Sequence, residues 1–213
     1  MQRPMTVRAL EDRDRDAAVE VLTSAFAGDV LLVWACGARE RQGMRTSCRM
    51  TIALSIAARA AYGYFDGERL IAVALFQRSE QTPTAWQSIR AGFWRVPLDA
   101  GPRAALRIIR AFGEADAFKA QVMGDERYFY LDTLGVHRAA AGRGLGQHLL
   151  RTSLSRLREE APRTCFLLTH QPHNVRLYER LGFEVIGECS VTDSPITFWG
   201  MRQAHSLGKP GGF

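Results

Sequence analysis

The hydrophobic pattern along the chain changes repeatedly between helical and strand periods, which predicts an α/β protein. Apolar residues three or four positions apart indicate helices at about 12–27, 39–61, 144–158 and 174–181. Short apolar runs indicate strands at 6–10, 62–65, 70–77, 128–136, 164–169, 183–189 and 196–202. Asp66-Gly67 is a turn dipeptide and joins two of these runs into an expected β-hairpin. We therefore expect an α/β (α+β) fold, with a mixed central sheet of about six to seven strands flanked by helices.

Residues 79–124 have the least regular pattern and are expected to form a helical insert. An expected helix ends at Pro97 and carries three aromatic residues: Trp86, Phe93 and Trp94. We expect them to pack in the core; the alternative is that they line an aromatic acceptor pocket. A second helix opens at Gly101-Pro102 and has on one face Leu106, Ile109 and Phe112. With no linker or repeat in the sequence, residues 1–205 are expected to form a single domain, followed by a frayed tail at 206–213.

Composition excludes several classes of protein. The 213 residues are 46% hydrophobic and 23% charged, too apolar for disorder. No segment approaches the roughly 20 apolar residues of a spanning helix, and the N-terminus lacks an apolar signal core, so no membrane partner is expected. The cysteines are scattered without metal-ligand spacing, which favours a reducing cytoplasmic location and no metal: Cys36, Cys48, Cys165 and Cys189.

The net charge of +6 comes almost entirely from arginine. Lys119 and Lys209 are the only lysines among 28 basic residues, which leaves 26 arginines. Such an excess suits phosphate recognition, but an arginine-preferring genome also produces it. Because the arginines are spread along the chain among acidic residues, no nucleic-acid partner is expected. Only Arg143, in the glycine-rich loop described next, has a position that indicates a specific phosphate role.

The most informative segment is a glycine-rich loop between the strand at 128–136 and the helix that follows. It reads Ala141-Gly142-Arg143-Gly144-Leu145-Gly146. Backbone N–H groups at a helix N-terminus form an anion site, suited to phosphate or pyrophosphate. The alternative is a tight strand-to-helix connection that is glycine-rich for steric reasons alone. The loop has neither the lysine of a P-loop nor the Gly-x-Gly-x-x-Gly spacing of a dinucleotide site.

This loop resembles the acetyl-CoA loop of the GNAT N-acetyltransferase superfamily, Gln/Arg-x-x-Gly-x-Gly/Ala, with Ala141 in place of the usual first residue. Asn174-Val-Arg-Leu-Tyr178-Glu-Arg-Leu-Gly182-Phe183 resembles the downstream motif of the same superfamily. The two motifs occur in the expected order within residues 128–190, and residues 6–27 resemble the family's opening strand and helix. The chain is also weakly similar to the puromycin N-acetyltransferase-like subgroup, from which it departs at Leu168.

The resemblance implies a GNAT-like fold and acetyl-CoA (coenzyme A) as cofactor. The implied cofactor-binding residues are Leu134, Gly135, Val136, Ala141, Gly142, Arg143, Gly144, Leu145, Gly146, Asn174 and Tyr178. The insert at 79–124 would shape the acceptor side of the site. We expect a small-molecule amine as acceptor, and the protein to be a monomer or a homodimer.

Tyr178 is the candidate acid, because a phenol is protonated at neutral pH and can donate to a departing thiolate. The candidate base stays open among Asp132, Glu126, His170 and a water chain. Asp132 and Val136 are an even number of residues apart, which in a regular strand puts them on one face. Glu126 precedes that strand, and His170 ends the next one.

The expected activity is acetyl transfer from acetyl-CoA to a primary amine, by direct attack in a ternary complex. A route through Cys165 is not expected, since a cysteine in an apolar strand is usually a small hydrophobe. Two alternatives keep the same fold: a catalytically idle acyl-CoA-binding sensor, and acetylation of a protein amine.

Overall fold

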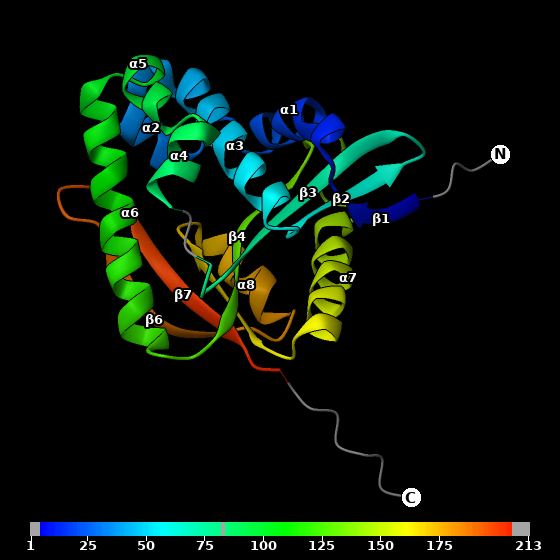
Figure 1. The fold of residues 1–213 in the computed structure, drawn as a ribbon. Coiled ribbons are helices and arrows are strands. Elements are labelled where there is room, and N and C mark those ends of the chain that lie inside the picture. Colours follow the sequence, from blue (N-terminus) through cyan, green and yellow to red (C-terminus); the bar gives the residue numbers. More distant parts are fainter. Residues whose placement is uncertain (1–4, 82–83, 206–213) are drawn as a thin grey trace, which may run out of the picture.

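The computed structural model describes residues 5–81 and 84–205, so the expected tail at 206–213 lies outside the described residues. A seven-stranded sheet runs through the molecule (Figure 1). In spatial order its strands are β1 (Met5–Ala9), β2 (Ala61–Asp66), β3 (Arg69–Arg78), β4 (Tyr128–Val136), β5 (Thr164–Thr169), β7 (Thr197–Gln203) and β6 (Glu184–Ser190). Only β4 and β5 are parallel neighbours. The predicted α/β class with a mixed sheet is confirmed.

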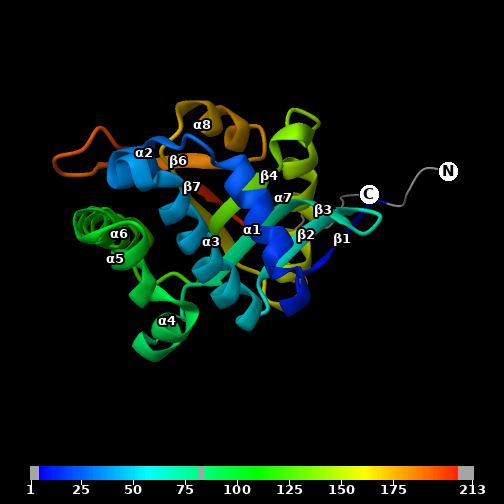
Figure 2. The same ribbon diagram turned by 90° about the horizontal axis from the view of Figure 1, so that it is seen from above.

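Helices cover both faces of the sheet (Figure 2). One face carries α1 (Arg15–Ala25), α2 (Val30–Cys36) and α3 (Glu40–Ala57), and the other carries α7 (Leu145–Glu160) and α8 (Pro172–Glu179). The insert forms α4 (Ala85–Ala91), α5 (Val96–Asp99) and α6 (Pro102–Met123), of which α6 packs against β6 and β7. Within the described residues there are also four 3-10 turns, at Asp12–Asp14, Gly37–Arg39, Phe93–Arg95 and Arg138–Ala140.

Strand β3 is the centre of the core. Every side chain from Ala72 to Phe76 is fully buried, because both faces of the strand are covered. Ala74 and Phe76 pack on the α7 side, whereas Val73 and Leu75 pack against α1 and α3. A strand buried on both faces needs a continuous apolar run instead of alternation, which explains the uninterrupted run seen in the sequence.

Strands β4 and β5 pair over only part of their length. The parallel pairing runs from Tyr128 opposite Thr164 to Leu131 opposite Leu167 and then stops. Beyond this point β4 continues to Val136 beside β3, while β5 continues to Thr169 beside β7. The two strands therefore diverge and leave an opening in the middle of the sheet.

A β-bulge in β4 lies at the start of this opening. Leu75 pairs with Thr133 and Phe76 with Leu131, so Asp132 is an extra residue opposite β3. The bulge reverses the alternation of side chains, and Val136 packs on the α7 side of the sheet. Asp132 instead receives a hydrogen bond from Gln77 (2.9 Å), on the α3 side. The expectation that Asp132 and Val136 share one face is therefore wrong.

The helical part of the fold departs from the sequence-based prediction in its details. Helix α2 was not expected, and Pro97 begins α5 instead of ending a helix. On α6 the three residues expected on one face do share it, but that face is exposed: Leu106, Ile109 and Phe112. The three aromatic residues expected in the core are exposed as well: Trp86, Phe93 and Trp94.

The buried face of α6 is made instead mainly of alanines. Ala104, Ala105, Ala111 and Ala115 all lie on it. Near the other end of the helix, Phe118 packs where β6 and β7 carry Gly187 and Gly200, and a Cβ on Gly200 would lie 2.8 Å from its ring.

Among the described residues, no individual helix has the length and apolar character needed to cross a bilayer. The segments Asp12–Ala25 and Val30–Ala57 meet that criterion only when taken together, with a 95° bend between them.

Gly135 should be required for the packing of α1 against β4. A Cβ at this position would lie 2.7 Å from Leu22 Cδ2 and 3.1 Å from Ala25 Cβ. We expect Gly135→Val to lower the free energy of unfolding by about 1–3 kcal/mol through overpacking, as measured by urea denaturation. Gly113→Ala is the control: nothing lies within 4 Å of its Cβ, so the helix should gain about 0.5–1 kcal/mol. An unchanged midpoint for Gly135→Val would contradict this account.

Candidate active site

The opening between β4 and β5 leads into a cleft of about 490 Å³. It brings together residues that are far apart in the sequence, from the end of β4, the end of β5 and the first turns of α8. The sequence-predicted residues that line it are Asp132, Leu134, Gly135, Val136, His170, Asn174 and Tyr178. A larger hollow of about 700 Å³, between α7 and β6–β7, contains none of the predicted residues.

The glycine-rich loop lies at the end of β4 and leads into α7. Gly142 and Gly144 have φ angles of 77° and 73°, in the left-handed region that favours glycine. Gly146 serves a different purpose, because a Cβ there would lie 3.1 Å from Val136 Cγ2. The three glycines therefore allow the turn and bring the first turn of α7 against the end of β4.

The first turn of α7 has the features of an anion site. The N-cap residue is Gly144, which has no side chain to accept from the first N–H groups, and residues 141–144, Arg143 included, are exposed. Since the first N–H groups of a helix have no intrahelical acceptor, they remain available to an anion at the positive end of the helix dipole. The loop thus fits the pyrophosphate of a nucleotide-containing cofactor such as coenzyme A. Gly135, which was expected to bind the cofactor, packs closely against Leu22 and Ala25 of α1.

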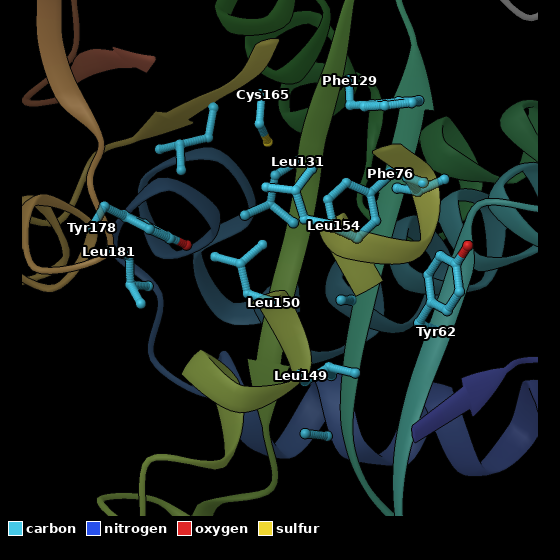
Figure 3. Packing of buried hydrophobic residues seen from close by; sticks show 14 of the residues in the cluster. Tyr62, Phe76, Phe129, Leu131, Leu149, Leu150, Leu154, Cys165, Tyr178 and Leu181 are labelled. Atoms are coloured by element: carbon cyan, nitrogen blue, oxygen red, sulfur yellow. The ribbon is translucent and has the colours of Figure 1, made fainter. Parts of the chain in front are cut away.

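Tyr178 reaches the cleft from α8. It is 8% exposed, and its ring packs edge-on against Phe183 at a centroid distance of 5.6 Å. Figure 3 shows the ring extending from α8 toward the strand that carries Leu131, with Leu150 and Leu181 nearby. Burial raises the pKa of the Tyr178 phenol. The group is therefore protonated across the physiological range and suited to donate a proton.

Asp132 reaches the cleft from the other face of the sheet. Its carboxylate accepts hydrogen bonds from Gln77 Nε2 (2.9 Å) and Thr133 Oγ1 (2.8 Å). Burial raises the pKa of Asp132, and the charge of Asp116 acts in the same direction; the Thr133 hydrogen bond and the Lys119 ammonium oppose the rise. A carboxylate whose pKa is raised toward neutrality is a better proton acceptor than an exposed one.

His170 also lies in the cleft, but one of its ring nitrogens is occupied. Nε2 lies 2.8 Å from Asp29 Oδ2. Asp29 is at the same time the N-cap of α2, where it accepts from the N–H groups of Leu31 (3.0 Å) and Leu32 (3.3 Å). Burial alone would raise the pKa of Asp29, but His170 and these N–H groups hold it below its ordinary value. The pair therefore ties α2 to the end of β5.

Glu126, the third predicted base, lies apart from these residues. It does not line the cleft, and its carboxylate is 4.0 Å from Arg202 on β7. Asn174 is in the first turn of α8, where the N-cap position is taken by Gln171. Its side chain is therefore not committed to capping.

Sequence reasoning missed several residues on the wall opposite α8. From α6, Lys119 forms an ion pair with Asp116 (2.6 Å), and its ammonium lies 4.3 Å from the centre of the Tyr130 ring. Phe112 and Asp29 complete this side. The i,i+3 spacing of Asp116 and Lys119 was a usable signal, whereas Asp29 could not be found without α2. Of the insert, α6 lines part of the cleft, whereas Trp86 and Trp94 do not line it.

Part of the chain matches a known domain, and the fold is shared with solved structures. Residues 117–204 match the model of the acetyltransferase (GNAT) domain. A structure described as histone acetyltransferase HPA2 and related acetyltransferase from Corynebacterium glutamicum shares the fold, with a TM-score of 0.69, 22% identity, and coverage of 97% of this chain and 98% of that one.

Two further structures share the fold at lower identity. A polyamine N-acetyltransferase from Drosophila melanogaster, described as forming N-acetylagmatine, matches with a TM-score of 0.63 and 13% identity, over 93% of this chain and 98% of that one. A GNAT acetyltransferase from Brucella melitensis in complex with acetyl-CoA matches with a TM-score of 0.54 and 17% identity, over 99% and 94%. The domain match thus covers residues 117–204, and solved structures of acetyltransferases share the fold of nearly the whole chain.

Proposed function

We propose that the protein transfers an acetyl group from acetyl-CoA to a primary amine of a small molecule, by direct attack in a ternary complex. One observation carries this proposal: Tyr178 and Asp132 approach the same cleft from opposite faces of the sheet. A proton donor on one side and a proton acceptor on the other suit the two ends of the reaction, the departing thiolate and the attacking amine.

The loop at Gly142–Gly146 would hold the pyrophosphate of coenzyme A, with Arg143 as a mobile counter-charge. The backbone of Leu134–Val136, which has no β5 partner beside it, would bond the pantetheine arm. Asn174 would hold the same arm from α8. The cofactor supplies the acetyl group as a thioester, and the remaining chemistry is proton transfer by this chain.

Asp132 is our choice for the base. Its raised pKa favours accepting a proton from an ammonium group, and its hydrogen bonds to Gln77 and Thr133 fix its orientation. His170 is the second choice because Asp29 already occupies its Nε2. Glu126 is the weakest, since it lies outside the cleft.

Tyr178 would act as the acid, with its proton donated to the departing thiolate. A covalent route through Cys165 is disfavoured, because that thiol is fully buried and burial raises its pKa to about 12. A thiol that stays protonated is a poor nucleophile.

The acceptor is proposed to be a small amine. The polyamine acetyltransferase that shares the fold acts on such a molecule, and the acidic side chains in the cleft would attract an ammonium group. The resemblance to the puromycin N-acetyltransferase-like subgroup stays a prediction. Acetylation of a protein amine and an idle sensor are the alternatives that the experiments below distinguish.

Acetyl-CoA should raise the melting temperature of the protein through linkage. At a hundredfold excess over Kd the gain is about 2.7 kcal/mol, or roughly 5–10 °C for a chain of this length. Gly146→Val should lose this shift, since its side chain would push α7 away from Val136. Ser155→Val, an exposed position on the same helix, should retain it. No shift for the wild-type protein at millimolar acetyl-CoA would count against the cofactor assignment.

Tyr178→Phe should lower kcat by about 10²- to 10⁴-fold, because the hydroxyl proton is lost while the ring remains. Release of the free thiol is measured with acetyl-CoA and a panel of polyamines, arylalkylamines, aminonucleosides, aminoglycosides and peptides. The variant should keep the thermal shift with acetyl-CoA. Wild-type turnover by the variant would exclude the acid role, whereas turnover by neither protein with any amine would favour the sensor.

Asp132→Asn should remove the part of the pH profile in which kcat rises as the base loses its proton. The pKa of Asp132 is higher in the folded protein than in the unfolded chain. The protonated carboxyl therefore stabilises the fold at a pH below the unfolded-state pKa, and this contribution is lost as the pH rises through the folded-state pKa. At neutral pH the Asn variant should therefore unfold at a higher urea concentration than the wild type while turning over more slowly. His170→Gln, the comparison variant, should keep the rising limb. If His170→Gln loses that limb and Asp132→Asn keeps it, the assignment of the base is reversed.

A further inference from the structure

The helical insert exposes a large set of apolar side chains on α4–α6. We call this set the insert surface; it consists of Trp86, Ile89, Trp94, Leu98, Leu106 and Ile109. Trp86 and Leu98 are each 66% exposed and Leu106 is 69% exposed. A monomer in water rarely leaves this many large apolar side chains uncovered on consecutive segments of one insert, so they indicate a binding partner.

The same helices are strongly basic. Their exposed charged residues between 85 and 113 are all arginines: Arg90, Arg95, Arg103, Arg107 and Arg110. The single acid in this stretch, Asp99, accepts hydrogen bonds from Thr46 (2.6 Å) and Gln42 (3.0 Å) of α3.

Some of these arginines already have partners. Arg107 donates to the carbonyl of Trp34 (2.9 Å). Arg110 forms ion pairs with Glu114 (3.2 Å) and Asp193 (3.1 Å). For the other three, no ion pair exists with any residue that the structure describes. The insert surface is therefore both apolar and positively charged.

We propose that the insert surface binds the anionic surface of a lipid bilayer. Tryptophan and aliphatic side chains enter the boundary between headgroups and acyl chains, and arginines beside them pair with anionic headgroups. On α6 the two classes of side chain lie beside one another on the exposed face, because Leu106 is three residues from Arg103 and four from Arg110. This is the arrangement of a helix that lies in a membrane interface, and it departs from the expectation of no membrane partner.

Charge argues against a second copy of the chain as the partner. In a two-fold contact the same patch meets itself, so the three arginines without an ion pair among the described residues would face those of the other copy, with no exposed acid between 85 and 113 to pair with them. A nucleic acid would satisfy the arginines but not the aliphatic residues Ile89, Leu98 and Leu106. An anionic bilayer satisfies both.

The insert surface also continues into the cleft. Phe112 follows Ile109 on α6, is 51% exposed, and lines the cleft between β4 and β5. A protein bound to a bilayer through the insert surface would therefore have one wall of its cleft next to the lipid headgroups.

The test is sedimentation of the full-length protein with vesicles of phosphatidylcholine, with and without phosphatidylglycerol. We expect binding only to the anionic vesicles, with release when salt is raised from about 0.1 M to about 1 M. Arg90→Gln with Arg103→Gln should weaken binding about 30-fold. Trp86→Ser with Trp94→Ser should weaken it too, and should abolish the blue shift of tryptophan fluorescence on vesicle addition.

Arg69→Gln with Arg180→Gln is the matched control, since it removes the same charge from exposed positions elsewhere and should leave binding unchanged. The thermal shift with acetyl-CoA, measured on each variant, separates loss of the fold or of cofactor binding from loss of vesicle binding. Three results would overturn the proposal: equal or no binding to the two kinds of vesicle, a salt-resistant dimer that the tryptophan variant abolishes, or capture of nucleic acid that only the arginine variant abolishes.

Discussion

Four residue pairs join β4 to β5, from Tyr128 with Thr164 to Leu131 with Leu167, and beyond them the strands separate. The position of every candidate site residue depends on where this pairing stops. The glycine-rich loop begins where β4 ends, and α8 begins shortly after β5 ends, so the divergence decides how far apart the loop and Tyr178 lie. Longer pairing would bring the two strands together and fill the cleft with backbone.

On the other side of the sheet, the bulge at Asp132 determines which face the carboxylate of this residue occupies. Without the extra residue, Asp132 would share the face of Val136 and would compete with the packing between β4 and α7. With it, the carboxylate is turned toward Gln77 and is desolvated among side chains of α3 and α6. The chemistry proposed for the site thus depends on the single extra residue that the bulge inserts into β4.

Much of the sheet could be predicted from the sequence, because strands buried on both faces leave continuous apolar runs. The bounds of β4 and β5 were obtained correctly in this way, and the loop was found because its glycines follow β4 directly. The face of Asp132 could not be predicted, since a bulge adds a residue without a mark in the hydrophobic pattern. Helix α2 was missed because its seven residues are nearly all apolar and show no helical period. On α6 the spacing of Leu106, Ile109 and Phe112 gave the period correctly, but it did not show that the alanine face is the buried one.

The packing of Phe118 against the glycines of β6 and β7 has a mechanical consequence for the long helix α6. Toward the N-terminus of the helix, Ala104 and Ile108 pack in a separate buried cluster with Ala35 of α2 and Val96 of α5. The helix is therefore anchored at two places along its length, by an aromatic ring against the sheet and by small side chains against other helices. Asp116 and Lys119 lie within one turn of Phe118, so the charged wall of the cleft is fixed relative to β6 and β7.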